Sequence, residues 1–239
     1  MQEMLDHIDR RLTFHGLGVE KLTNKQFEKI MDRITEIVNT AVINHEEYDN
    51  FIPTWVNCRE DWDFRLKDSG KLPHVDKHVD FMVESLSVPI KLKVRHVLNK
   101  GPCYWGYESN SNLELGDLVH MPFIGRFIES KYYYKTLFHE FGHACCSVDR
   151  LKIKMEDAEE EICVEIVALF LCIVYGLNIW DDAIKYIINW SYENRDEQKR
   201  PLYKTKTEWR RINNNAKNII RYMFTGKKKH KGTIHFNVG

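Results

Sequence analysis

Two histidines and a glutamate in the stretch 139–143 have the types and spacing needed to hold a metal ion and to use it. The order is His139-Glu140-Phe141-Gly142-His143. Side chains four residues apart lie one above the other on a helix, so the imidazoles of His139 and His143 can reach one ion. Glu140 follows the first histidine directly, and its carboxylate can take a proton from a water molecule held by that ion. The spacing therefore predicts two metal ligands with a catalytic base beside them.

The neighbouring sequence favours a buried position for this helix. The stretches 132–138 and 144–146 are too apolar to form a solvated helix face, so we expect the two histidines to point into a groove. A helix that carries two histidines by chance would need a more polar setting. The arrangement is the one that zinc peptidases use, and it predicts Zn²⁺ as the cofactor.

A catalytic zinc ion takes three protein ligands and leaves one position open, so a third ligand is needed. The stretch 156–172 is acidic at its start and then apolar, as expected for a buried helix. Glu161 and Glu165 are four residues apart and share a face of that helix. We predict that Glu161 is the third ligand and that Glu165, deep among apolar neighbours, accepts a ring N–H from a ligating histidine. Glu160 and Glu165 remain rival ligands.

Several blocks of the chain also resemble a known family in order and spacing. They resemble the metallopeptidase domain of ArdC-type antirestriction and polyvalent proteins, over about residues 113 to 224, in the following blocks: 117–122, 127, 133–143, 150–151, 160–165, 168–172 and 186–190. The resemblance implies a gluzincin-like zinc enzyme that hydrolyses peptide bonds in a protein substrate. It also implies a gene carried by a phage, plasmid or other mobile element, and a role in antirestriction or DNA transfer.

Members of that family carry an N-terminal domain that binds single-stranded DNA, so the resemblance implies this second partner. Trp55 and Trp62 lie among charged residues and are interleaved with Arg59, Arg65 and Lys67. Such aromatic rings either stack on bases or pack in the protein. The basic segment 227–231 is either a solvated end or a contact to phosphates. An alternative function follows: a DNA-shielding antirestriction protein in which zinc mainly holds the fold.

The remaining patterns predict a small α+β domain around the metal site. Thr23 and Gln26 form a capping box before an amphipathic helix, and short strands are expected near residues 90–98, 103–107 and 118–121. Strands followed by a metal-binding helix and a second buried helix indicate a zincin-like fold. We predict three regions: an N-terminal region with a degenerate DNA-binding domain at 1–72, the metallopeptidase domain at 73–226, and a flexible basic tail at 227–239.

The strand that ends near Met121 is predicted to be the edge strand that pairs with a peptide substrate. His120 on this strand faces either the metal cleft, as an oxyanion or substrate contact, or solvent, because the register cannot be derived from sequence.

Composition limits the other functions. The chain has 35 Lys plus Arg against 35 Asp plus Glu, so its net charge gives no general affinity for nucleic acid. No apolar run reaches the length of a bilayer span, and the first residues lack a signal peptide, which predicts a cytoplasmic protein without a membrane partner. The cysteines show no C-x-x-C pair and are expected to be reduced.

Overall fold

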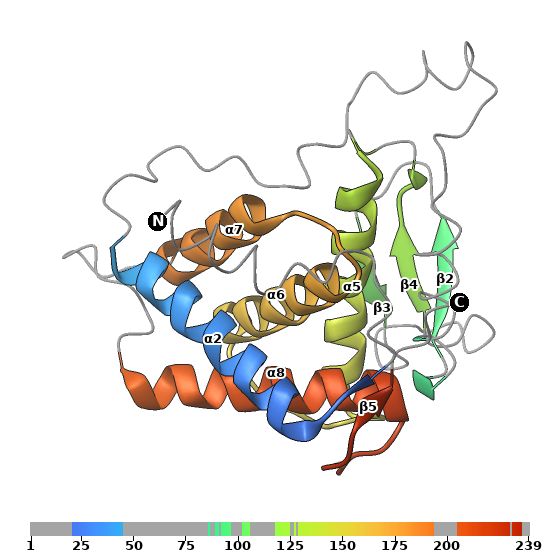
Figure 1. Cartoon of the computed structure of the whole chain (residues 1–239). Coiled ribbons are helices and arrows are strands. Elements are labelled where there is room, and N and C mark those ends of the chain that lie inside the picture. The colour runs from blue at the N-terminus through green and yellow to red at the C-terminus, as the bar shows by residue number, and fades with distance from the viewer. Residues whose placement is uncertain are drawn as a thin grey trace.

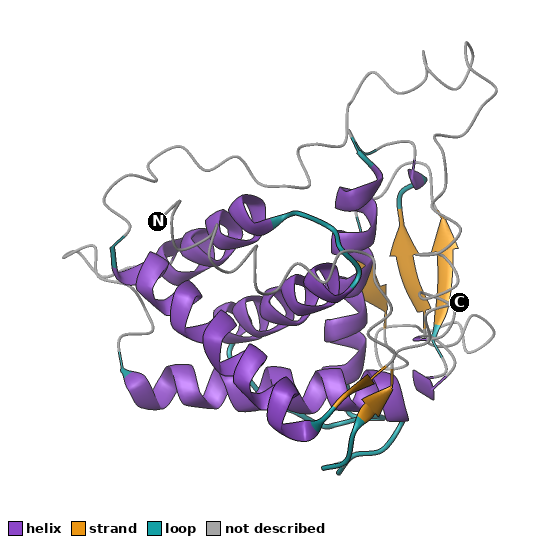
Figure 2. Cartoon of the chain, in the orientation of Figure 1, coloured by secondary structure: helices purple, strands orange, loops and turns teal. Residues whose placement is uncertain are grey.

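Five long helices and two small sheets make up the described part of the chain (Figures 1 and 2). The computed structural model describes residues 21–44, 86, 89–90, 92–96, 102–105, 118–124, 127, 129–193, 205–229 and 231–235. The helices are α2 Asn24–Ile43, α5 Ser130–Cys146, α6 Asp157–Val174, α7 Trp180–Glu193 and α8 Lys206–Thr225. The strands are β1 Lys21–Leu22, β2 Lys93–His96, β3 Cys103–Trp105, β4 Leu118–Met121 and β5 Ile234–His235. The α+β class predicted from sequence is confirmed.

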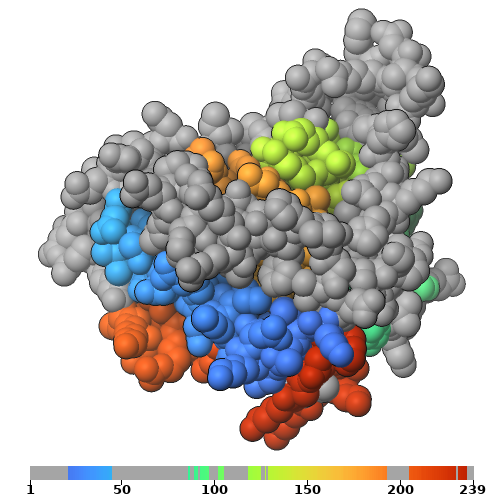
Figure 3. Space-filling view, viewed as in Figure 1, coloured from blue at the N-terminus to red at the C-terminus, as the bar shows by residue number. Residues whose placement is uncertain are grey.

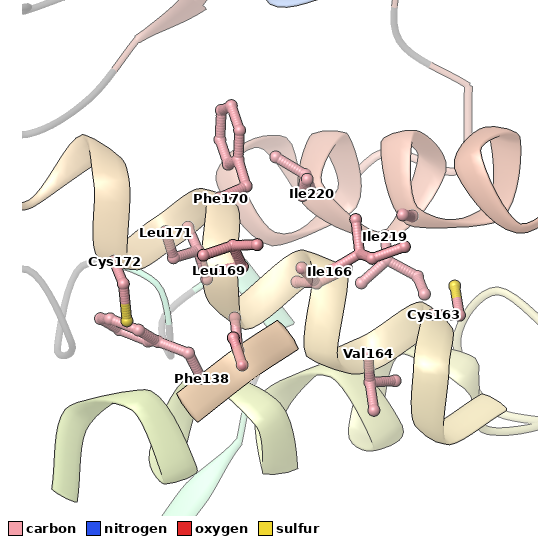
Figure 4. Close-up of a cluster of buried hydrophobic side chains, with 14 of the residues drawn as sticks. Phe138, Cys163, Val164, Ile166, Leu169, Phe170, Leu171, Cys172, Ile219 and Ile220 are labelled. Carbon is pink, nitrogen blue, oxygen red and sulfur yellow. The ribbon is translucent and has the colours of Figure 1, made fainter. Parts of the chain in front are cut away.

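Helix α6 lies at the centre of the hydrophobic core. It packs against α5, α7, α8 and α2, and its apolar residues from Ile162 to Cys172 are fully buried. Figure 4 shows this helix between Phe138 of α5 on one side and Ile219 and Ile220 of α8 on the other. A helix that is apolar all round needs such surroundings, because every face must be kept from water. The acidic residues at the N-terminal end of α6 are thereby held at the edge of the core, next to α5.

Helix α2 belongs to the same core. It begins at the predicted capping box, in which the Thr23 hydroxyl accepts a hydrogen bond from the Gln26 backbone N–H and the Gln26 side chain accepts one from the Thr23 N–H. Its apolar face packs on α6, α7 and α8, and Lys217 of α8 forms ion pairs with Glu28 and Asp32. The described part of the predicted N-terminal region therefore packs on helices α6, α7 and α8. The rest of that region, 1–20 and 45–72, lies outside the described residues.

The larger sheet has the strand order β2-β4-β3, with β2 parallel and β3 antiparallel to β4. Strand β4 is therefore central, and the prediction that the strand ending near Met121 is an edge strand is wrong. The spacing of apolar residues identifies a strand but does not reveal which neighbours it pairs with. Among the described strands β2 and β3 are the outer ones, and β3 and β4 both contact α5.

The smaller sheet joins the two ends of the described chain. Strand β5 pairs antiparallel with β1, with Leu22 opposite Ile234, and the space-filling view shows these two ends side by side (Figure 3). Ile234 is completely buried. The predicted flexible tail, 227–239, is thus corrected at these residues, because the apolar Ile234 follows the run of lysines and enters the core. No helix in the described part of the chain combines the length and the apolarity that crossing a membrane requires.

Candidate metal centre

The two histidines of α5 and one glutamate of α6 converge on a single point. The Nε2 atoms of His139 and His143 are 3.1 Å apart. The Glu161 carboxylate is 3.1 Å from His139 Nε2 and 3.4 Å from His143 Nε2. These are the residues of the described chain that are grouped closely enough to hold a metal ion, with ligand atoms all within 4.8 Å of one another.

This donor set fits zinc. Two imidazole nitrogens and a carboxylate oxygen are ordinary zinc ligands, and zinc in proteins is tetrahedral with bonds of about 2.0–2.1 Å. Simple geometry then places neighbouring ligand atoms about 3.3 Å apart. The two Nε2 atoms are 3.1 Å apart, and the Glu161 carboxylate reaches His139 Nε2 with Oε2 at 3.1 Å and His143 Nε2 with Oε1 at 3.4 Å. The three side chains therefore lie close enough together to share one zinc ion.

Each histidine is held from behind by a second carboxylate. His139 Nδ1 donates a hydrogen bond to Glu165 at 2.8 Å, and His143 Nδ1 donates one to Glu160, also at 2.8 Å. A hydrogen bond at Nδ1 fixes the ring and leaves Nε2 directed at the centre. The structure thus places Glu165 where the sequence predicted it, and Glu160, a rival ligand on sequence grounds, contacts the far side of His143.

Glu140 lies buried on α5 beside the two histidines. Burial raises its pKa, and the positive imidazoles and a hydrogen bond from the Tyr104 backbone N–H oppose that rise only in part. A carboxylate with a raised pKa is a stronger base, which suits Glu140 to accepting a proton. Tyr104 belongs to β3, which places this outer strand next to Glu140.

The charges of the ligands depend strongly on one another. Burial alone would lower the pKa of His143, but hydrogen bonds with Glu160 and Glu161 raise it to about 10. The pKa of His139 is raised for the same kind of reason, by Glu161 and Glu165. Burial would raise the pKa of Glu161, yet the two imidazoles hold it well below its ordinary value. Opposite charges therefore stabilise the cluster.

Close contact between α5 and α6 brings the ligands together. Gly142, inside the histidine motif, lies so near α6 that an added Cβ atom would be 2.7 Å from the Cβ of Val164. Val164 lies between Glu161 and Glu165 on α6. A side chain at position 142 would therefore separate the two helices where the histidines meet the glutamates.

Two residues that the sequence analysis did not assign to the site also contact it. The Tyr186 hydroxyl of α7 donates a 2.6 Å hydrogen bond to Glu161, and its ring packs edge-on against His139. Lys135 of α5 forms a 2.6 Å ion pair with Glu165. A signal for Lys135 was present, since a lysine in an apolar run one helical turn before a metal ligand needs a buried partner. Tyr186 has no such signal, because its distance along the chain from Glu161 is not a helical spacing.

Three further residues were predicted as substrate or DNA contacts. His120 is half-buried on β4, in register with Arg95 of β2 and Cys103 of β3, and its contact with a substrate stays a prediction. Trp55 and Trp62 lie outside the described residues. Four cysteines of the described chain are buried: Cys145, Cys146, Cys163 and Cys172.

Comparison with known families agrees with this geometry. Residues 107–204 match a family of zincin-like metallopeptidases, which confirms the resemblance in that segment. The matched segment holds the two histidines and every glutamate of the cluster. The segment is therefore similar to zincin-like metallopeptidases. No curated protein and no solved structure matches the chain significantly.

Proposed function

We propose that the protein is a zinc-dependent metallopeptidase that hydrolyses peptide bonds in a protein substrate. The observation that carries this proposal is the donor set of His139, His143 and Glu161 at zinc spacing, with the buried carboxylate of Glu140 beside it. Two carboxylates behind the histidines and the match to zincin-like metallopeptidases support it further.

Each side chain has a distinct part in the reaction. When bound, zinc acidifies a water molecule and polarises the substrate carbonyl. Glu140 accepts the proton of the attacking water and passes it to the amine that leaves. Glu165 and Glu160 keep the two imidazoles oriented, and Tyr186 holds Glu161. Burial of Glu140 keeps competing water away from the proton that it carries.

Strand β3 is the best candidate for pairing with the substrate backbone. It is an outer strand of the described sheet, it contacts α5, and its residue Tyr104 touches Glu140. An extended peptide added to this strand would bring its scissile bond close to the base. We therefore propose that the substrate pairs with β3 rather than with β4, the strand predicted from the sequence.

Glu140→Gln tests the function directly. The substitution removes the proton acceptor but no predicted metal ligand, so we expect zinc content to stay at about one per chain while hydrolysis falls a hundredfold or more. Zinc is measured by elemental analysis, and hydrolysis by cleavage of an unfolded protein such as casein. Glu156→Gln, an exposed position before α6, is the matched control. Loss of zinc in Glu140→Gln would instead make Glu140 a ligand.

We further propose, on the family resemblance, that the enzyme acts in antirestriction or DNA transfer for a phage or other mobile element, in the host cytoplasm. Single-stranded DNA is the second partner in this proposal. The alternative function, a DNA-binding protein with a structural zinc ion, predicts that Glu140→Gln leaves all measurable activity unchanged. The buried base beside the metal ligands favours the peptidase.

A further inference from the structure

Lys135 is a buried cation that lies behind the metal ligands. Its side chain is 4% exposed, and its Nζ atom is 2.6 Å from a Glu165 oxygen, whose own side chain is completely buried. The other oxygen of the same carboxylate accepts the hydrogen bond from His139 Nδ1 at 2.8 Å. Lys135, Glu165 and His139 therefore form a continuous chain of contacts that ends at the ligand atom Nε2.

The same ammonium group also touches the support of the third ligand. Lys135 Nζ lies 4.8 Å from the centre of the Tyr186 ring, at a distance typical of a cation–π contact. Tyr186 in turn donates its hydroxyl hydrogen to Glu161 and accepts a hydrogen bond from Trp190. One cation thus contacts the partners of two different ligands, one from α5 and one from α6.

The position of Lys135 on its helix makes this possible. Lys135, His139 and His143 follow one another at intervals of four residues, so they lie on one face of α5 over three successive turns. A fully buried carboxylate is costly unless it is paired, and a buried ion pair is retained where it gives a unique geometry. Lys135 is the buried partner of the Glu165 carboxylate inside the core.

We propose that Lys135 is a positioning residue of the metal centre, which fixes Glu165 and through it the imidazole of His139 in the orientation that binds zinc. This inference rests on the proposed zinc site. It assigns to Lys135 an effect on metal affinity rather than on substrate binding, since its ion pair with Glu165 and its contact with the Tyr186 ring both lead to metal ligands.

Zinc affinity of four variants tests the proposal, measured by competition with a chelator of known affinity. We expect Lys135→Met to bind zinc about ten- to a hundredfold more weakly, the usual effect of losing a partner behind a ligand. Lys131→Met is the matched control: it lies one turn earlier on α5, pairs with Glu129 at 3.0 Å and lies over the Tyr132 ring. Because that pair is more exposed, the control should change the affinity less than about threefold.

A double variant shows whether Lys135 acts through Glu165. Removing Lys135 alone leaves a buried charge and can unfold the protein, whereas Lys135→Met with Glu165→Gln removes both charges and restores a neutral core. We expect this double variant to bind zinc as Glu165→Gln does. The visible spectrum of the Co²⁺-loaded protein should shift in the same way in both, because each loses the same constraint on His139.

The outcomes separate this inference from the proposed function. If the wild-type protein binds no zinc, both the metal centre and the positioning role are overturned. If the wild type binds zinc and Lys135→Met binds it equally well, only the positioning role is overturned. A further loss of affinity in the double variant beyond that of Glu165→Gln would also overturn it, because Lys135 would then act independently of Glu165.

Discussion

At the scale of single residues, four carboxylates in a small volume differ in function because they face different partners. Glu161 faces both Nε2 atoms, Glu160 and Glu165 face one Nδ1 atom each, and Glu140 faces the backbone of β3. Identical groups acquire different chemistry when burial and neighbouring charges differ. The proposed ligand, the proposed supports of the histidines and the proposed base therefore differ in which atoms they contact.

The glutamates of α6 should differ in their effect on metal binding. Glu161→Ala removes a ligand and should abolish most of the zinc affinity, because two imidazoles alone hold the ion weakly. Glu165→Ala and Glu160→Ala should each cost about ten- to a hundredfold, since only the orientation of a ligand is lost. Chelator competition gives all three values. A greater loss at Glu165 or Glu160 than at Glu161 would exchange their assignments.

Metal-stripped protein should lose stability as the pH rises above neutral. The pKa of His143 is raised from 6.5 to about 10 in the folded protein by Glu160 and Glu161. A raised folded pKa stabilises the fold fully below pH 6.5, and that stabilisation is lost as the pH rises through the folded value. The pKa of His139 shifts in the same direction.

We therefore expect the urea midpoint of chelator-treated protein to fall between pH 6.5 and about 10. His143→Ala should make this dependence shallower. Added zinc should stabilise the protein increasingly over the same range, because zinc binds the neutral imidazoles and competes with protons. A midpoint that rises with pH in the stripped protein would contradict the charge pattern described for the cluster.

At the scale of elements, the site depends on how closely α5 approaches α6. The ligands of α5 are one turn apart on a single helix, so their spacing is local, but their distance to Glu161 depends on packing between helices. Gly142 and Val164 are in contact at this crossing. The absence of a side chain at position 142 is what permits the contact.

Gly142→Ala should destabilise the protein despite the better helix propensity of alanine. Alanine gains about 1 kcal/mol over glycine in a free helix, but overpacking a tight contact costs typically about 1–3 kcal/mol and moves the backbones apart. We expect a lower urea midpoint together with weaker zinc binding, since His139 and His143 would move away from Glu161. A more stable variant with unchanged zinc affinity would show that an alanine side chain at position 142 fits between α5 and α6 without moving them apart.

At the scale of the whole molecule, segments distant in sequence pack into one core around helices α5 and α6. Helix α2 packs on α8 near the other end of the chain, and β1 pairs with β5. The lysines at 227–229 are exposed beside this small sheet. With equal numbers of acidic and basic residues in the chain, any attraction for nucleic acid has to come from such local groups.

Binding of single-stranded DNA should accordingly be weak and strongly salt-dependent. Substituting Lys227, Lys228 and Lys229 with alanine should reduce the salt slope by roughly 0.7 for each phosphate that a lysine no longer neutralises. Substitution is preferable to deletion because Ile234 of the same segment is buried.

Trp55→Ala or Trp62→Ala should weaken binding by about 1–3 kcal/mol if these rings stack on bases. A titration at low salt that shows no binding would leave a peptidase without a DNA partner.

The sequence by itself was sufficient for every feature that depends on local spacing. Several features follow from the helical repeat, which is a property of a few consecutive residues. They are the histidine pair, Glu140, the shared face of Glu161 and Glu165, and the capping box at Thr23. The fold class followed from the same repeats combined with the family resemblance.

Contacts between elements were decided only by the tertiary structure. These contacts join residues far apart in the chain: the pairing of β4 with β2 and β3, Glu160 with His143, β5 with β1, Lys135 with Glu165, and Tyr186 with Glu161. Spacing along one segment carries no information about which other segment it meets or in what register. That choice is made by the packing of the whole core, which brings α5, α6 and α7 together around one metal centre.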